Sequence, residues 1–327
     1  MIYPEFIKKN GVIGICAPSA GVGKKLDSFL DSNRYLKSLG YKIKESESVR
    51  VNNERSASKT KRAQELDALV IDKRVNIIMC AAGGDYMYEM LPYVDFDHIK
   101  ENPKWICGAS DPTNLLFTMT TNLDIATLYG RNGAGFSLDN DKSQDDFFKI
   151  IKGDLVKQKS FKKYRSFIDA INDVNEFNSD VKYVGSGDFD IKGRLIGGCL
   201  DVICKLIGTK FDKTNEFIDR YKDDGIIWYF DIFSMSAYDF YLTLLQLENA
   251  GWFRYCKGIL LGRVAFERID DPKLDYIKAL KKVAKNIPYA CEMDIGHTDP
   301  CWTLINGAIA GVKVKDNKGE IKFELIV

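Results

Sequence analysis

The chain has 327 residues, of which 45% are hydrophobic and 28% are charged, a composition typical of a globular protein with room for two domains. Its 47 Lys and Arg residues balance its 46 Asp and Glu residues, so no net positive field would attract nucleic acid. No apolar run approaches the roughly 20 residues that span a bilayer. We therefore expect neither a nucleic-acid partner nor a membrane partner.

The cysteines and the N-terminal residues predict a cytoplasmic protein. The eight cysteines are scattered without a CxxC pair, as expected for reduced thiols. The opening segment MIYPEFIKKNGVIGICAPSAG lacks the basic start, unbroken apolar core and cleavage site of a secretory signal. Only two histidines occur, so no metal site is expected. The segment GVGKK lacks the first glycine and the final Ser or Thr of a phosphate-binding loop, so no nucleotide cofactor is expected.

The first 150 residues alternate apolar strand-like runs with amphipathic helices. Strands with their closing turns are predicted over residues 11–20, 41–49, 75–84, 104–110 and 124–130. Helices are predicted between them, over residues 28–40, 59–73 and 114–123. This alternation predicts a parallel sheet with helices on both faces, that is, a Rossmann- or flavodoxin-like α/β domain over residues 1–150.

Three turns follow strands of this predicted sheet. They are Pro18-Ser19-Ala20, Gly83-Gly84-Asp85 and Gly108-Ala109-Ser110-Asp111. Because ligands bind beyond the carboxyl ends of parallel strands, we expect the three turns to converge on one edge of the sheet.

The remainder of the chain predicts a linker and a second domain. Residues 151–184 are polar and weakly periodic, and we expect them to connect the domains. Residues 185–327 contain further strand-like segments, a helix that ends at Gly251, and a closing hairpin around residues 317–319. We expect a smaller C-terminal α/β domain with a mixed β-sheet.

The segment WICGASDPTNLL places Ser110 between a predicted strand and a predicted helix. One interpretation is that Ser110 or Asp111 caps a helix whose first turn contains Pro112. The other is a nucleophile on a tight strand-to-helix turn, similar in part to G-x-S-x-G, with Gly108 present and Pro112 in place of the last glycine. Local sequence leaves both interpretations open.

The Gly83-Gly84 pair also has two interpretations. Paired glycines after a strand permit a sharp turn. Backbone N–H groups exposed in such a turn would also supply half of an oxyanion hole.

A serine nucleophile needs a general base, and the chain has only His98 and His297. His98 lies in the polar stretch DFDHIKENPK, whereas His297 directly follows a predicted strand, so His297 is the better candidate. Asp231 follows five apolar residues in GIIWYFDIF, where a carboxylate requires a partner. An imidazole N–H and backbone N–H groups are both possible partners.

Several stretches, in order along nearly the whole chain, resemble the LD-carboxypeptidase family of serine peptidases, whose members include microcin C immunity proteins. They are GVIGICAPSAG, RAQELDALVIDKRVNIIMCAAGGD, MLPYVDFDHIKENPKWICGASDPTNLL, GRLIGGCLDVICKLIGT, GIIWYFDIF and DIGHTDP. Two positions depart from the family pattern: Asp231 stands where glutamate is usual, and Cys199 where asparagine is usual.

The resemblance implies a cytoplasmic serine hydrolase that needs no metal or cofactor. Ser110 is then the nucleophile, His297 the general base and Asp231 the third triad member, with the site formed where the two domains meet. The backbone N–H groups of Gly84 and Asp111 become the oxyanion hole.

The resemblance also implies a substrate: a muropeptide tetrapeptide that loses its terminal D-alanine in peptidoglycan recycling. A terminal carboxylate requires a cationic partner, for which we nominate Arg131; the alternative interpretation of Arg131 is a surface arginine. Two alternatives stay open: an immunity enzyme that cleaves a peptidyl- or aminoacyl-nucleotide antibiotic, and a peptide-binding member without catalysis. An aromatic wall that stacks on a nucleobase would favour the first, but Trp228, Trp302 and Tyr183 leave this undecided. A homodimer is expected by family analogy.

Overall fold

The computed structural model describes residues 1–137, 141–172 and 174–326. The chain forms two compact units. The first unit contains Met1–Leu155 and the short segment Thr303–Asn306, and the second contains Val156–Trp302 and Gly307–Ile326.

The first unit is built on a six-stranded sheet with the order β14-β5-β4-β3-β1-β2. Its strands are β1 (Val12–Cys16), β2 (Lys42–Glu45), β3 (Val75–Cys80), β4 (Trp105–Gly108), β5 (Thr127–Tyr129) and β14 (Leu304–Asn306). Strands β1 to β5 are parallel, and β14 is antiparallel to β5. The order 2-1-3-4-5 of the parallel strands is that of the flavodoxin-like fold, which confirms the predicted α/β architecture.

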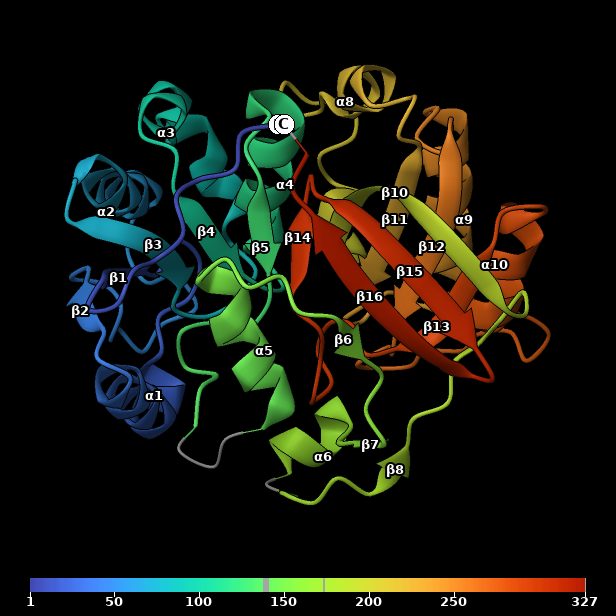
Figure 1. Cartoon of the computed structure of the whole chain (residues 1–327), viewed down its shortest axis with the longest axis horizontal. Coiled ribbons are helices and arrows are strands. Elements are labelled where there is room, and N and C mark those ends of the chain that lie inside the picture. The colour runs from blue at the N-terminus through green and yellow to red at the C-terminus, as the bar shows by residue number, and fades with distance from the viewer. Residues whose placement is uncertain (138–140, 173, 327) are drawn as a thin grey trace. The chain divides into compact units, whose positions relative to one another are not determined.

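Helices cover both faces of this sheet. They are α1 (Leu26–Ser38), α2 (Lys59–Ile71), α3 (Phe96–Glu101), α4 (Thr113–Leu123) and α5 (Lys142–Ile151), with 3₁₀ turns at Gly23–Lys25 and Tyr88–Tyr93. Helices α2, α3 and α4 lie on one face, and α1 and α5 lie on the other (Figure 1). On that second face the rings of Tyr35 and Phe148 join α1 to α5, with centroids 5.7 Å apart.

The second unit contains an eight-stranded mixed sheet with the order β6-β16-β15-β10-β11-β12-β13-β9. Its strands are β6 (Gln158–Lys159), β9 (Val184–Gly185), β10 (Phe189–Cys199), β11 (Ile226–Asp231), β12 (Cys256–Gly262), β13 (Tyr289–Met293), β15 (Ile309–Lys315) and β16 (Lys318–Glu324). Strands β10 to β13 are parallel, and the others are antiparallel to their neighbours. The mixed sheet agrees with the prediction.

Within the described part of the second unit, helices and a small ribbon complete the structure. The helices are α6 (Phe167–Ile171), α7 (Leu200–Ile203), α8 (Thr214–Arg220), α9 (Ala237–Asn249) and α10 (Tyr276–Ala284); the ribbon pairs β7 (Lys163–Tyr164) with β8 (Ser179–Asp180). Its core includes Trp228, which stacks on Trp252 at 5.4 Å and donates its indole N–H to the Trp252 carbonyl. Both rings are fully buried.

The structure differs from the expected connections in two places. Residues 156–184, expected to be a linker, contribute short strands to the second unit, because β6 pairs with β16 and β9 with β13. Two-residue strands have no periodicity that a sequence pattern could reveal. The closing hairpin turns at Asp316 and Asn317, both with positive φ, one residue before the expected position.

Among the described residues, no helix is both long enough and apolar enough to cross a membrane.

Candidate functional site

Ser110 lies on a tight turn between β4 and α4. Its φ of +69° is in the left-handed region, which is uncommon for a residue with a side chain and marks a backbone held by its surroundings. The Ser110 N–H donates to the Tyr129 hydroxyl at 3.2 Å. The preceding residue, Ala109, exchanges two hydrogen bonds with the Asn132 side chain, at 3.0 and 3.3 Å. The turn is therefore fixed from β5 and from the segment that follows it.

The structure tests the capping interpretation of Ser110. Helix α4 begins at Thr113, its N-cap is Pro112, and no side-chain hydrogen bond caps it. The hydroxyl of Ser110 is thus not a helix cap. A half-buried serine on a left-handed turn before a helix has the geometry of a nucleophile elbow.

The three turns converge, as predicted from the sequence. The Ser19 hydroxyl donates to the Asp111 carboxylate, and the Ala20 N–H donates to the Gly83 carbonyl at 3.1 Å. A Cβ atom added to Gly83 would lie 3.2 Å from the Ser110 Oγ. The turns after β1, β3 and β4 are therefore neighbours at the carboxyl edge of the sheet.

Gly84 is exposed and has a φ of +138°. Among the described residues, no acceptor takes its backbone N–H. An oxyanion donor requires an N–H group that is available to solvent and lies near the attacking oxygen.

The carboxylate of Asp111 is buried, with 3% of the residue exposed. Its Oδ2 accepts from the Ser19 hydroxyl and from the Met87 N–H, the latter at 2.7 Å. Its Oδ1 accepts from the Asn114 side chain at 2.9 Å. Asp111 thus joins the turn that carries Ser110 to the segment that follows Gly84.

In the second unit, Asp231 and His297 form a pair. Asp231 ends β11 and is fully buried, and its Oδ2 lies 2.7 Å from the Nδ1 of His297. This separation is within ion-pair and hydrogen-bonding range. The imidazole side chain is 11% exposed. A buried carboxylate beside Nδ1 orients the ring and stabilises its protonated form, which is the role of the acid in a serine-hydrolase triad.

Two glycines allow the His297 loop to reach Asp231, which lies two strands away in the sheet. The loop follows β13 and must cross β12 to approach the end of β11. A Cβ on Gly262, at the end of β12, would overlap the Ile295 carbonyl oxygen. A Cβ on Gly296, whose φ is +95°, would overlap the Asp231 carboxylate. The loop can therefore approach closely enough for the shorter aspartate side chain to reach the ring.

A buried polar network anchors both ends of the His297 loop. Arg263 donates to the Asp294 carboxylate at 2.6 Å and to the Thr298 hydroxyl at 3.3 Å. The Tyr183 hydroxyl donates to the other Asp294 oxygen at 2.6 Å. Burial, together with the charge of Asp294, raises the pKa of Tyr183 well above its usual value, so Tyr183 stays a neutral donor.

Aromatic rings surround the His297 imidazole. Phe233 and Phe167 lie 4.9 and 5.8 Å from it between ring centroids, and both rings contact Phe266. By contrast, Trp228, Trp302 and Tyr183, the aromatics considered from the sequence, are each at most 1% exposed. Those three cannot form a wall that stacks on a ligand.

Cys199 lies beside Asp231, its parallel neighbour in the β10–β11 ladder. It is buried, and its Sγ lies 3.8 Å from the Asp201 carboxylate. Asp201 accepts from the N–H groups of Phe233 and Ser234 at 2.9 and 3.0 Å. The departure at position 199 therefore sits next to the carboxylate that holds the loop after Asp231.

Arg131 has partners within the first unit. Its guanidinium pairs with Asp141 at 2.6 Å and donates to the Gly135 carbonyl and the Ser143 hydroxyl, both at 2.7 Å. Asp141 in turn caps α5. A role in binding a substrate carboxylate stays a prediction for Arg131, and it would require exchange of the Asp141 pair.

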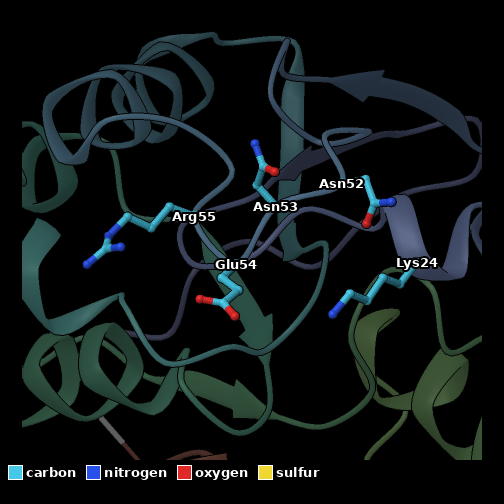
Figure 2. A pocket seen from close by; sticks show the side chains of 5 residues that line it. All are labelled: Lys24, Asn52, Asn53, Glu54 and Arg55. Atoms are coloured by element: carbon cyan, nitrogen blue, oxygen red, sulfur yellow. The ribbon is translucent and has the colours of Figure 1, made fainter.

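A polar hollow of about 490 Å³ lies in the first unit, lined by Lys24, Asn52, Asn53, Glu54 and Arg55 (Figure 2). The Arg55 guanidinium stacks on the Tyr86 ring at 3.5 Å and pairs with Glu89. Two residues of the lining, Glu54 and Arg55, therefore contact Tyr86, which lies two residues after Gly84 in the chain. The lining contains cationic, anionic and neutral side chains that can form hydrogen bonds.

Within residues 1–137, 141–172 and 174–326, one group of side chains brings three metal-type ligand atoms within 4.8 Å of one another. It consists of Asp67, Asp95 and His98. The Nδ1 of His98 lies 2.7 Å from Asp67, and Asp95 caps α3 through the His98 N–H. These groups are partnered by one another. Because His98 is engaged on α3, it leaves His297 as the better candidate base.

Two side chains near these turns were not predicted from the sequence: those of Arg62 and Ser19. Arg62 lies on α2 and is 1% exposed, and its guanidinium donates to the carbonyls of Pro18 and Tyr86. The sequence does hold one indication for Arg62: it lies at helical spacing from the apolar residues Leu66 and Leu69, on the buried face of α2. A charged residue is rarely buried unless it has a partner.

Comparisons with known proteins identify the family of the chain. Residues 13–130 match the family described as LD-carboxypeptidase N-terminal domain, and residues 192–312 match the LD-carboxypeptidase C-terminal domain. The chain is 26% identical to the carboxypeptidase-named protein YocD of Bacillus subtilis, over 95% of this chain and 96% of that protein. It is also 26% identical to the Microcin C7 self-immunity protein MccF of Escherichia coli, over 94% of this chain and 91% of that protein.

Solved structures share the fold. An MccF-like protein from Bacillus anthracis superposes with a TM-score of 0.85 at 22% identity, covering 100% of both chains. A muramoyltetrapeptide carboxypeptidase from Oxalobacter formigenes superposes with a TM-score of 0.75 at 20% identity, covering 97% of this chain and 100% of that one.

Proposed function

Because the chain belongs to the LD-carboxypeptidase family of serine peptidases, we propose that Ser110, His297 and Asp231 act together as its catalytic triad in peptide-bond hydrolysis. The observation that carries the proposal is the Asp231–His297 pair, with 2.7 Å between carboxylate and Nδ1. A fully buried carboxylate beside a nearly buried imidazole prepares the ring to accept a proton at Nε2.

In the proposed acylation step, His297 Nε2 takes the Ser110 proton as Oγ attacks the carbonyl carbon of the scissile amide. The backbone N–H groups of Gly84 and Asp111 donate to the oxygen, which becomes negatively charged as the carbonyl double bond opens. Asp231 stabilises the imidazolium through Nδ1. These interactions strengthen as charge develops, so they lower the barrier more than they stabilise the bound substrate.

The tetrahedral intermediate then collapses. His297 gives its proton to the leaving amine, the C–N bond breaks, and the acyl group stays on Ser110. His297 next deprotonates a water molecule, which attacks the ester carbonyl, and the acid product leaves as Ser110 regains its proton.

The proposed substrate is a muropeptide tetrapeptide, and the proposed product is free D-alanine with the corresponding tripeptide. The family membership and the fold shared with a muramoyltetrapeptide carboxypeptidase support this choice. Aspartate in place of the usual glutamate does not argue against catalysis, because the Gly296 backbone brings the His297 ring to the shorter side chain.

Incubation of the purified protein with a tetrapeptide that ends in D-alanine, followed by mass spectrometry, tests this proposal. The expected products are the tripeptide and D-alanine. The Ser110→Ala variant should fold normally and release neither product, because the attacking oxygen is gone. Release of D-alanine by this variant would exclude Ser110 as the nucleophile.

A second substrate is favoured by the ring cluster of Phe167, Phe233 and Phe266 beside His297. An apolar aromatic surface suits a flat heterocycle better than a charged peptide terminus. MccF has been solved with glutamyl sulfamoyl guanosine, so an aminoacyl sulfamoyl nucleoside is the natural comparison substrate. Cleavage of this compound but not of the tetrapeptide would assign the protein to detoxification.

A further inference from the structure

A continuous buried polar network links the turn that carries Ser110 to the turn that contains Gly84. At its centre, Ser19 is fully buried and uses its hydroxyl twice. It donates to the Asp111 carboxylate and accepts from the Tyr86 N–H at 3.3 Å. The Met87 N–H reaches the same carboxylate oxygen directly, at 2.7 Å. The two residues after Asp85 are thus held by one carboxylate and one hydroxyl.

Arg62 holds the same segment from α2. Its Nη1 donates to the Pro18 carbonyl at 2.8 Å and to the Tyr86 carbonyl at 3.0 Å, and its Nη2 pairs with Glu89 at 2.5 Å. Burial lowers the pKa of this guanidinium, whereas the charges of Glu89 and Asp111 act in the opposite direction. The cation therefore also offsets the negative charge that Asp111 places in the interior.

The network contributes little net free energy to the stability of the fold. A buried carboxylate and a buried guanidinium each lose their hydration, and well-packed apolar side chains often stabilise a protein as much or more. What such a network does supply is a fixed geometry, because every donor and acceptor in it requires its partner in one position. The segment that it fixes follows the Gly83-Gly84 turn, in which Gly83 lies beside Ser110.

We propose that the Asp111 side chain is a positioning residue: through Ser19 and the Met87 N–H it holds the Gly83-Gly84 turn at a set separation from Ser110. The inference rests on the proposed function, in which the N–H groups of Gly84 and Asp111 are the two oxyanion donors. One donor residue thus uses its own side chain to place the turn that carries the other donor.

Displacement of an oxyanion donor raises the free energy of the transition state. The oxyanion hydrogen bonds form only as charge develops, so a loosened turn lowers the rate of attack and leaves substrate binding nearly unchanged. Loss of one complete donor lowers kcat by about 10²- to 10³-fold in serine proteases. A donor that is present but displaced should therefore cost about 10- to 100-fold.

Ser19→Ala is the test variant, and Ser56→Ala is its matched control. Ser56 is also a buried serine near this edge, and its hydroxyl donates to the Ala17 carbonyl at 2.6 Å. Its backbone N–H, which the substitution keeps, donates to the Ser19 carbonyl at 3.0 Å. Each variant loses one buried side-chain hydroxyl. Two readouts are compared: hydrogen exchange of peptides that cover residues 81–91, and the second-order rate of Ser110 labelling by a fluorophosphonate probe.

In Ser19→Ala we expect faster amide hydrogen exchange over residues 84–87 and labelling of Ser110 that is about 10- to 100-fold slower. In Ser56→Ala both rates should stay within about threefold of those of the unaltered protein. Asp111→Asn should exchange faster and label more slowly than Ser19→Ala. Its single amide oxygen cannot replace both carboxylate oxygens as acceptors for the Ser19 hydroxyl, the Met87 N–H and the Asn114 side chain. Equal exchange and equal labelling of the two serine variants would overturn the positioning role. Absence of labelling in the unaltered protein would instead refute the proposed function, and the exchange comparison would still decide whether the network holds the turn.

Discussion

The substitution Gly296→Ala tests whether the close approach of the Gly296 backbone to Asp231 is needed for the Asp231–His297 pair. A Cβ at this position overlaps the Asp231 carboxylate, and the φ of +95° disfavours any residue with a side chain. The left-handed backbone costs an L-residue about 1–2 kcal/mol. For a unit of this size, that cost lowers the melting temperature by roughly 2–8 °C.

The activity should fall by more than the loss of stability explains. Carbon and oxygen atoms need about 3.5 Å, so relief of the overlap moves the carboxylate or the loop by more than about 1 Å. Misplacement by about 1 Å costs a catalytic group about a hundredfold in rate. We therefore expect Gly296→Ala to label with a fluorophosphonate probe about 100-fold more slowly than the unaltered protein.

Gly187→Ala is the matched control in the same unit. Gly187 has a φ of +105°, and nothing lies within 4 Å of an added Cβ, so the substitution introduces the backbone cost without the overlap. It should lower the melting temperature by a similar amount and retain its labelling rate. Labelling rates for the two variants that agree within about threefold would refute the reasoning, because backbone strain alone would then explain Gly296→Ala.

Three further predictions concern other charged groups. Asp231→Asn should lower the hydrolysis rate by about 10⁴-fold, as loss of the orienting charge does in serine proteases; near-normal kinetics would show that another group orients His297. The hydrogen bond and charge of Asp67 raise the pKa of His98, so its stabilisation is complete below about pH 6.5 and is lost as pH rises through the raised folded value. The melting-temperature difference between the unaltered protein and His98→Asn should therefore shrink from pH 5.5 to pH 9, and a constant difference would contradict it. Arg131→Met should lower the free energy of unfolding by about 1–3 kcal/mol through loss of the Asp141 pair, with KM unchanged; a KM increase of tenfold or more would support the substrate-binding role instead.

The strands of the first unit were predictable because their sequences are continuous apolar runs that end in turn residues. The runs before Pro18, Gly83 and Gly108 correspond to β1, β3 and β4. Since parallel strands direct their carboxyl ends to one edge, the convergence of the following turns was predictable as well.

Other elements depend on pairings that local sequence does not encode. β14 joins the sheet of the first unit only through its antiparallel partner β5, which lies far away in the chain. Helix α10, in contrast, carries a readable signal: Asp275 caps it, and its buried residues recur at helical spacing from Tyr276 to Ala284. That helix was missed although the pattern was present.

For the site, the scarcity of histidine and the family resemblance indicated Ser110, Asp231 and His297. The closeness of Asp231 to His297 followed only from the resemblance. Local sequence does not encode it, because it depends on the crossing of β12 at Gly262 and on the backbone conformation of Gly296. The burial of Arg62 and the bridging role of Ser19 were not predicted either, since each becomes meaningful only once three sequence-distant turns meet.

The most direct test of the central claim is fluorophosphonate labelling of the unaltered protein and of His297→Ala, with the modified residue located by mass spectrometry. If the triad operates, the adduct forms on Ser110 and the His297→Ala variant labels at least about a hundredfold more slowly, since the hydroxyl has lost its base. Labelling of Ser110 at the same rate in both proteins, or an adduct on a different residue, would contradict the claim.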